Sequence, residues 1–89
     1  MLEEGIEEQT RRVMINIQDT LEKTGWTMNN IVKSRIFLTD MKDYEAMNEV
    51  YASFFDSEYP TRFALEVSAL PAGWLVEIEC VAVGNEISE

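Results

Sequence analysis

The chain has 89 residues and a formal net charge of −10, with seven basic residues, 17 acidic residues and no histidine. This length predicts a single domain, residues 1–89, and the hydrophobic share of 46% is sufficient for a packed core. The charge argues against nucleic acids and anionic membrane surfaces as partners, because binding to either needs clustered Lys and Arg.

The scarcity of cysteine and histidine restricts the chemistry further. The one cysteine, Cys80, cannot form a disulfide within the chain, which indicates a reducing compartment. No stretch approaches the ~20 apolar residues of a transmembrane helix, and the acidic N-terminal segment is unlike a leader peptide. We therefore expect a cytoplasmic protein with no metal site.

An amphipathic helix is predicted over residues 4–24, because apolar side chains recur there at helical spacing. This stripe consists of Ile6, Val13, Met14, Ile17 and Leu21. Gly25 can adopt a positive φ and so end the helix. Residues 27–30 then have the composition of a turn.

A strand is predicted over residues 31–39, because apolar and polar residues alternate there. One face carries Val32, Ser34, Ile36 and Leu38, and the other carries Lys33, Arg35 and Phe37. A second helix is predicted over residues 44–56, with Asp40 or Asp43 as its cap, and Pro60 prevents its continuation.

Two further strands are predicted over residues 62–68 and 75–83, and the segment LPAGW between them predicts a hairpin loop. In the first strand one face carries Phe63, Leu65 and Val67, and the other carries Arg62, Ala64, Glu66 and Ser68. The order is therefore α-β-α-β-β, which predicts an α+β fold with two helices packed on one face of a small mixed sheet.

Charged residues occupy the second face of each predicted strand. They are Lys33, Arg35, Arg62, Glu66, Glu77 and Glu79. An exposed sheet with cross-strand ion pairs worth ~0.2–1 kcal/mol each would have this pattern. Apolar residues such as Phe37, Ala64 and Val81 share the face, however, and such a mixture suits a subunit interface better than open water. We therefore expect a homo-oligomer.

Two long segments resemble the motifs of the RidA (YjgF/UK114) family in order and spacing. They are IVKSRIFLTDMKDYEAMNEVYASFF and PTRFALEVSALPAGWLVEIECVAV, and the resemblance runs from about residue 6 to residue 83. It implies a chorismate-mutase-like fold, assembled as a homotrimer around a barrel of sheets with ligands in the clefts between subunits. It also implies hydrolysis of reactive enamines and imines to 2-keto acids and ammonia, without a cofactor.

The resemblance implies roles for four residues. Arg62 corresponds to the arginine that grips the substrate carboxylate, for which its planar fork is suited. Glu77, in VEIE, corresponds to the catalytic glutamate that positions the attacking water. Asn48, in MNEVY, corresponds to a helix asparagine near the cleft, and Ala64 stands at a substrate-binding position where cysteine or threonine is frequent.

Other interpretations of these residues stay open. Arg62 would also serve as an ion-pair partner of Glu79 or another carboxylate, Glu77 as a solvated strand carboxylate, and Asn48 as a helix-surface residue. Cys80 alternates onto the apolar face, which predicts a buried, inert thiol.

The function also has an alternative. The family pattern includes an N-terminal β-hairpin that lines the cleft, and this sequence has no counterpart of it, which would leave a sheet edge open to another chain. A non-catalytic trimer that binds small carboxylates, or a truncated interaction module of the same fold, is therefore the second hypothesis. The endoribonuclease label attached to the family is disfavoured by the charge of −10.

The predicted hairpin also gives an expected distance. If residues 68 and 75 pair beside the loop, Glu66 faces Glu77 and Arg62 faces Val81. Arg62 and Glu77 are then roughly 13 Å apart, at ~3.3 Å per residue. One chain would not hold both against a small substrate, whereas two adjoining subunits would.

Overall fold

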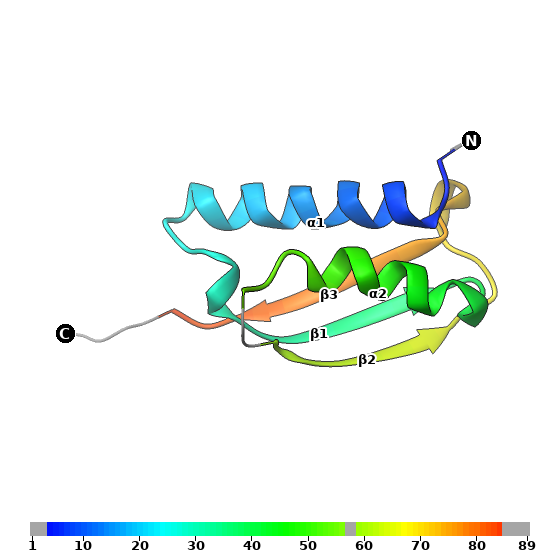
Figure 1. Ribbon diagram of the computed structural model, residues 1–89. Coiled ribbons are helices and arrows are strands. Elements are labelled where there is room, and N and C mark those ends of the chain that lie inside the picture. Colours follow the sequence, from blue (N-terminus) through cyan, green and yellow to red (C-terminus); the bar gives the residue numbers. More distant parts are fainter. Residues whose placement is uncertain (1–3, 57–58, 85–89) are drawn as a thin grey trace.

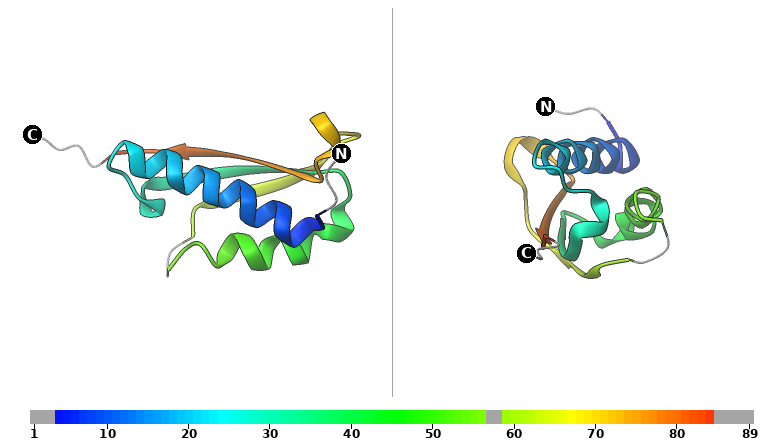
Figure 2. Two further views of the ribbon diagram at one scale, coloured as in Figure 1. Left: turned by 90° about the horizontal axis from the view of Figure 1, so that it is seen from above. Right: turned by 90° about the vertical axis from the view of Figure 1, so that its left-hand side faces the viewer.

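The structure is a computed structural model, and it describes residues 4–56 and 59–84. Its helices and strands are α1 (Ile6–Lys23), β1 (Ile31–Leu38), α2 (Tyr44–Ala52), β2 (Thr61–Glu66) and β3 (Val76–Ala82), with 3-10 turns at Met28–Asn30, Met41–Asp43 and Pro71–Gly73. Both helices lie on one side of a three-stranded sheet (Figures 1 and 2). The predicted α+β architecture is therefore confirmed.

Helix α1 follows the predicted stripe and is slightly shorter than predicted. It ends as expected, because Gly25 has a φ of +84° and the Gly25 N–H donates to the Glu22 carbonyl at 3.1 Å. Thr27 and Asn30 form a reciprocal capping box around the next turn and so fix the entry into β1. In the described part of the chain, neither helix combines the length and apolarity that crossing a bilayer requires.

Helix α2 is shorter than the predicted 44–56. Asp40 does act as a cap, but of the preceding 3-10 turn, where its carboxylate accepts from the Lys42 N–H at 3.0 Å. Asp43 makes no side-chain cap. The helix ends at Ala52, where Ser53 Oγ donates to the Val50 carbonyl at 2.6 Å, a local bond that competes with helix continuation.

The strand order is β2-β1-β3, so the predicted hairpin between the last two strands is wrong. Strand β2 runs parallel to β1 because α2 carries the chain back before β2 begins. The chain then crosses the end of β1, and β3 pairs antiparallel on its other side. Backbone bonds hold this crossing on both sides, from Val67 N to Leu38 O at 2.8 Å and from Thr39 N to Leu75 O at 3.2 Å.

A bulge at the start of β1 changes which residue faces the core. The register with β3 shifts between Ile31 and Lys33, and such an irregularity turns the side chains before it relative to those after it. Ile31 is consequently buried, while Val32 is 48% exposed. The prediction that Val32 belongs to the apolar face is wrong for this reason.

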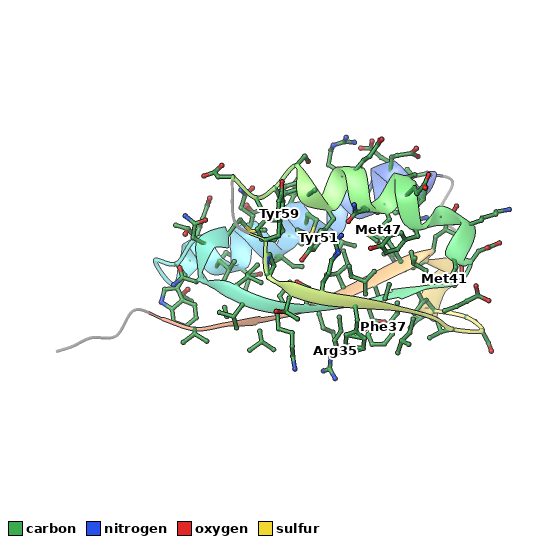
Figure 3. The ribbon with its side chains drawn as sticks, turned by 60° about the horizontal axis from the view of Figure 1, so that its bottom comes forward. Arg35, Phe37, Met41, Met47, Tyr51 and Tyr59 are labelled. Atoms are coloured by element: carbon green, nitrogen blue, oxygen red, sulfur yellow. The ribbon has the colours of Figure 1, made fainter. Side chains whose placement is uncertain are left out.

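The core lies between the helices and the central strand. Ser34, Ile36 and Leu38 of β1 are fully buried, together with Met14 of α1 and Met47 and Tyr51 of α2. Figure 3 shows Met47 and Tyr51 between α2 and the sheet, whereas Arg35 and Phe37 point to the opposite side. The sheet therefore has one face covered by helices and one outer face.

Candidate functional site

Arg62 lies on the helix-covered side of the sheet. Parallel pairing places Arg62 beside Ser34 and Ala64 beside Ile36, both of which face the helices. Phe63 and Leu65, between them in sequence, point outward and are 46% and 49% exposed. The prediction that Arg62 and Ala64 share a face with the charges of β1 and β3 is therefore wrong. The larger apolar residues of β2 are on the outer face, contrary to expectation.

The Arg62 guanidinium lies between two tyrosines of α2. Its Nη2 donates to the Tyr44 hydroxyl at 3.4 Å, and its Cζ lies 5.4 Å from the centroid of the Tyr51 ring, within cation–π distance. Among residues 4–56 and 59–84, no carboxylate forms an ion pair with Arg62. Glu79, one expected partner, instead pairs with Arg35 at 2.7 Å. The guanidinium is thus held by neutral groups.

A row of polar side chains continues from Arg62 across the sheet. Ser34 is the Cα partner of Arg62 on one side and of Cys80 on the other. The Tyr51 hydroxyl donates to Ser34 Oγ at 2.9 Å, and Ser34 Oγ lies 3.4 Å from Cys80 Sγ. Burial raises the pKa of Tyr51 and the pKa of Cys80, although the bond to Ser34 lowers each in part. Both groups are therefore protonated at neutral pH.

Asn48 lies on the same stripe of α2 as the two tyrosines, four residues after Tyr44 and three before Tyr51. Its Oδ1 is buried and has no hydrogen-bond partner among the described residues. Buried side-chain acceptors are nearly always paired in folded proteins. The hydrogen-bonding capacity of this oxygen is therefore unused among the described residues.

Glu77 occupies a different part of the molecule. It is exposed on β3, and its Cα partner on β1 is Phe37, which points away from the helices. The expected register is wrong, because Glu66 pairs with Leu38, and Val81 pairs with Lys33. Within one chain, Arg62 and Glu77 are separated by the sheet itself. The structure brings Arg62, Ala64 and Asn48 to one side and leaves Glu77 on the other.

The outer face mixes charged and large apolar side chains. It consists of Lys33, Arg35, Phe37, Phe63, Leu65, Glu77, Glu79 and Val81. The three largest apolar contributions from β2 and β3, Phe63, Leu65 and Val81, are each nearly half exposed. Apolar groups of this size in contact with water are typical of an interaction surface rather than of an isolated sheet.

A groove lies between α1 and β3, and the sequence did not predict it. This groove has a volume of about 510 Å³ and is lined mainly by apolar side chains, including Val13, Ile17, Leu21 and Trp74. In the described part of the chain β3 has β1 as its only neighbour, so its other edge is open along this groove. No group of His, Cys, Asp or Glu residues among those described is arranged to hold a metal ion.

Comparison with known proteins decides the family. The sequence profile of the endoribonuclease L-PSP family matches residues 1–84. The chain belongs to this family. It is the RidA family that the two long motifs resemble. The match covers every described element, so the fold and the family assignment rest on the same residues.

Individual relatives agree with this assignment. A RutC family protein of Pyrococcus horikoshii is 47% identical over 77 residues, which make up 86% of this chain and 61% of the relative. A 2-iminobutanoate/2-iminopropanoate deaminase of Capra hircus is 40% identical over 84 residues, which cover 94% of this chain and 61% of that protein. The chain thus spans about three fifths of the length of these relatives.

Solved structures confirm the RidA-like fold. The crystal structure of Escherichia coli TdcF with bound serine superposes with a TM-score of 0.89 at 33% sequence identity. The superposition covers 96% of this chain and 69% of the TdcF chain. The arrangement of the strands and of the two helices therefore occurs in a protein whose crystal structure contains bound serine.

The burial of the Cys80 thiol predicts that the stability of the protein depends on pH. The Cys80 thiol has a pKa above its ordinary value of 9.0 because it is partly buried. Below pH 9 the thiol is protonated in both states. Above pH 9 the thiol of the unfolded chain loses its proton, whereas the thiol of the native protein keeps its proton up to a higher pH. The free energy of unfolding therefore falls as the pH rises through the native pKa. Since Cys80 is partly exposed, the fall should be a fraction of ~1.4 kcal/mol per pH unit.

The measurement is urea unfolding at pH 7.5, 8.5 and 9.5, followed by circular dichroism, for the wild type and for Cys80→Ala. We expect the variant to lose part of the decline between the two highest pH values. Tyr51, whose pKa is also raised, acts in the same direction at higher pH and remains in both proteins. If the free energy of unfolding changes with pH to the same extent in both proteins, the conclusion that burial raises the pKa of Cys80 is contradicted.

Proposed function

We propose that this protein hydrolyses the reactive imines and enamines of small amino acids to 2-keto acids and ammonia. The observation that carries the proposal is the Arg62 guanidinium, which is held by Tyr44 and Tyr51 without a carboxylate partner among the described residues. Relatives named 2-iminobutanoate/2-iminopropanoate deaminase align with 94% of the chain. Substrates with those names carry a carboxylate and a C=N group on adjacent carbons.

The residues near Arg62 fit such a substrate. Arg62 pairs with the carboxylate through two parallel hydrogen bonds. The Asn48 side chain turns on substrate binding, so that its unpaired Oδ1 accepts a hydrogen bond from the imine N–H. Ala64, two residues after Arg62 on the same face, leaves room for the short side chain of the substrate. No cofactor takes part in this scheme.

The chemical step is the addition of water to the carbon of the C=N bond. A C–O bond forms, and the imine nitrogen takes up one proton of the water to give a carbinolamine. The hydroxyl proton of the carbinolamine then passes to the nitrogen, and the C–N bond breaks to release ammonia as the C=O bond forms. Glu77 accepts a hydrogen bond from the water and orients it toward that carbon. The contribution of the protein is therefore positioning and electrostatic stabilisation.

Glu77 must come from a second copy of the chain, since the sheet separates it from Arg62 within one copy. The outer face is suited to contact another copy, because apolar groups such as Phe63 and Leu65 are exposed beside the Arg35–Glu79 ion pair. We propose that three copies close through their outer faces, so that Glu77 of one copy approaches the β2 edge of the next. Such an assembly also increases the buried area of a small domain.

A second function is favoured by the separation of Arg62 from Glu77 within one copy of the chain. In this alternative, the protein binds small carboxylates at Arg62 and does not turn them over. Binding of 2-oxobutanoate, combined with no release of ammonia from 2-iminobutanoate above the rate in buffer, would favour it over hydrolysis.

Arg62→Ala should reduce hydrolysis mainly through KM. Hydrogen bonds to charged groups are worth ~1.5–3 kcal/mol, so kcat/KM should fall roughly 10- to 150-fold. The assay follows ammonia release from freshly generated 2-iminobutanoate. Arg11→Ala is the matched control, because Arg11 is an exposed arginine of α1 paired with Glu8 at 3.2 Å.

Wild-type ammonia release equal to that in buffer would contradict hydrolysis. Equal rates for wild type and Arg62→Ala, both above buffer, would contradict the role of Arg62. If the wild type degrades RNA, and both Arg62→Ala and Arg11→Ala still do so, the result would point instead to endoribonuclease activity.

Leu65→Asp should prevent assembly while the single chain still folds, because Leu65 is 49% exposed before assembly. Assembly of the variant would bury three aspartate carboxylates, one from each copy, and each would lose its water without gaining a partner of opposite charge. Sedimentation velocity of the wild type should give three times the chain mass of 10.3 kDa, and of the variant one chain mass. Ile15→Asp, at a residue of α1 that is 42% exposed, should sediment like the wild type. A wild-type monomer at tens of micromolar would contradict the trimer.

A further inference from the structure

The position of Arg62 needs an explanation, because it lies on β2, an edge strand of the sheet. An arginine side chain on an edge strand has many rotamers, and holding one of them costs conformational entropy. Proteins often restrain such an arginine with a carboxylate, but a carboxylate would also neutralise the charge that a substrate must meet. Here the guanidinium lies 5.4 Å from the Tyr51 ring centroid instead.

The Tyr51 ring is itself fixed. Its side chain is fully buried, and its hydroxyl donates to Ser34 Oγ at 2.9 Å. Ser34 is also fully buried, in the middle of the central strand. The Phe55 ring packs against Tyr51 in a tilted arrangement, with centroids 5.0 Å apart. A ring restrained at its hydroxyl and along its edge presents a defined surface to Arg62.

Tyr51 restrains the cation without neutralising it. Burial raises the pKa of Tyr51, so the phenol is uncharged at neutral pH and attracts the guanidinium through its ring face alone. Tyr44, whose hydroxyl accepts from Nη2 at 3.4 Å, provides a second neutral contact. The full positive charge of Arg62 is therefore retained for a ligand.

We propose that Tyr51 is a positioning residue for Arg62. Its ring, anchored to Ser34, holds the guanidinium in the orientation that receives the substrate carboxylate, and this role rests on the proposed function. Tyr51 does not touch the substrate in this scheme. Its effect on the reaction passes entirely through Arg62.

The kinetic test uses this dependence. Tyr51→Leu removes the ring and should raise KM for 2-iminobutanoate about 3- to 30-fold, with a smaller change in kcat, given the usual strength of a desolvated cation–π contact. Tyr51→Phe keeps the ring and loses its anchor, so it should recover most of that loss. Tyr59→Leu is the matched control, because Tyr59 is 54% exposed and also packs on Phe55, with centroids 6.2 Å apart.

The decisive comparison is made in the Arg62→Ala background. If Tyr51 acts through Arg62, then Tyr51→Leu should change kcat/KM less than twofold once Arg62 is absent. An equal loss in both backgrounds would show that Tyr51 supports only the fold, and an unchanged KM in the single variant would show that it does nothing for Arg62. Either result would overturn the proposal.

A second readout does not depend on turnover. The Arg62 Nε–H proton resonance should be shifted upfield from that of Arg11 by the ring current of Tyr51, and the shift should disappear in Tyr51→Leu. The wild-type spectrum tests the contact even if that variant fails to fold, since an Arg62 resonance at the position of Arg11 would overturn the proposal. An upfield Arg62 resonance in a protein that releases no ammonia would contradict the proposed function and leave the contact supported.

Discussion

The parallel pairing of β2 with β1 determines what the rest of the site can be. It places Arg62 beside Ser34 and Ala64 beside Ile36, both on the side that the helices cover. A shift of one residue in this register would turn Arg62 to the outer face, away from both tyrosines of α2. The crossover through α2 enforces the parallel direction, so the helix that restrains Arg62 is also the connection that sets the strand carrying it.

The periodicity of the sequence was sufficient to predict the helices, the strands and the α+β class. It was not sufficient for the strand order, because LPAGW is short enough for a hairpin, whereas β3 crosses the end of β1 and pairs with β1 rather than with β2. It also failed for the face of β2. Alternation shows that Phe63 and Leu65 share a face, but not which face is covered when both carry apolar residues. The bulge that turns Val32 outward has no local sequence signal of its own.

The candidate site residues were found by resemblance to family motifs rather than by composition. Their chemistry depends on residues that no motif identified as functional. Tyr51 is fully buried in the core beneath α2, and its ring is also the surface against which the Arg62 guanidinium lies. Ser34 was assigned only to the apolar face of its strand, although it links Tyr51 to Cys80. Such roles follow from contacts between elements distant in sequence.

The central claim is that Arg62 presents an unneutralised guanidinium on the helix side of β2 to a small carboxylate. The most direct measurement is a crystal structure grown with 2-oxobutanoate, the keto acid that 2-iminobutanoate would give. We expect its carboxylate on the Arg62 guanidinium, with the Tyr51 ring still against the far side of that group. Binding of the acid only in the groove between α1 and β3, or an Arg62 side chain turned to the outer face, would contradict the account.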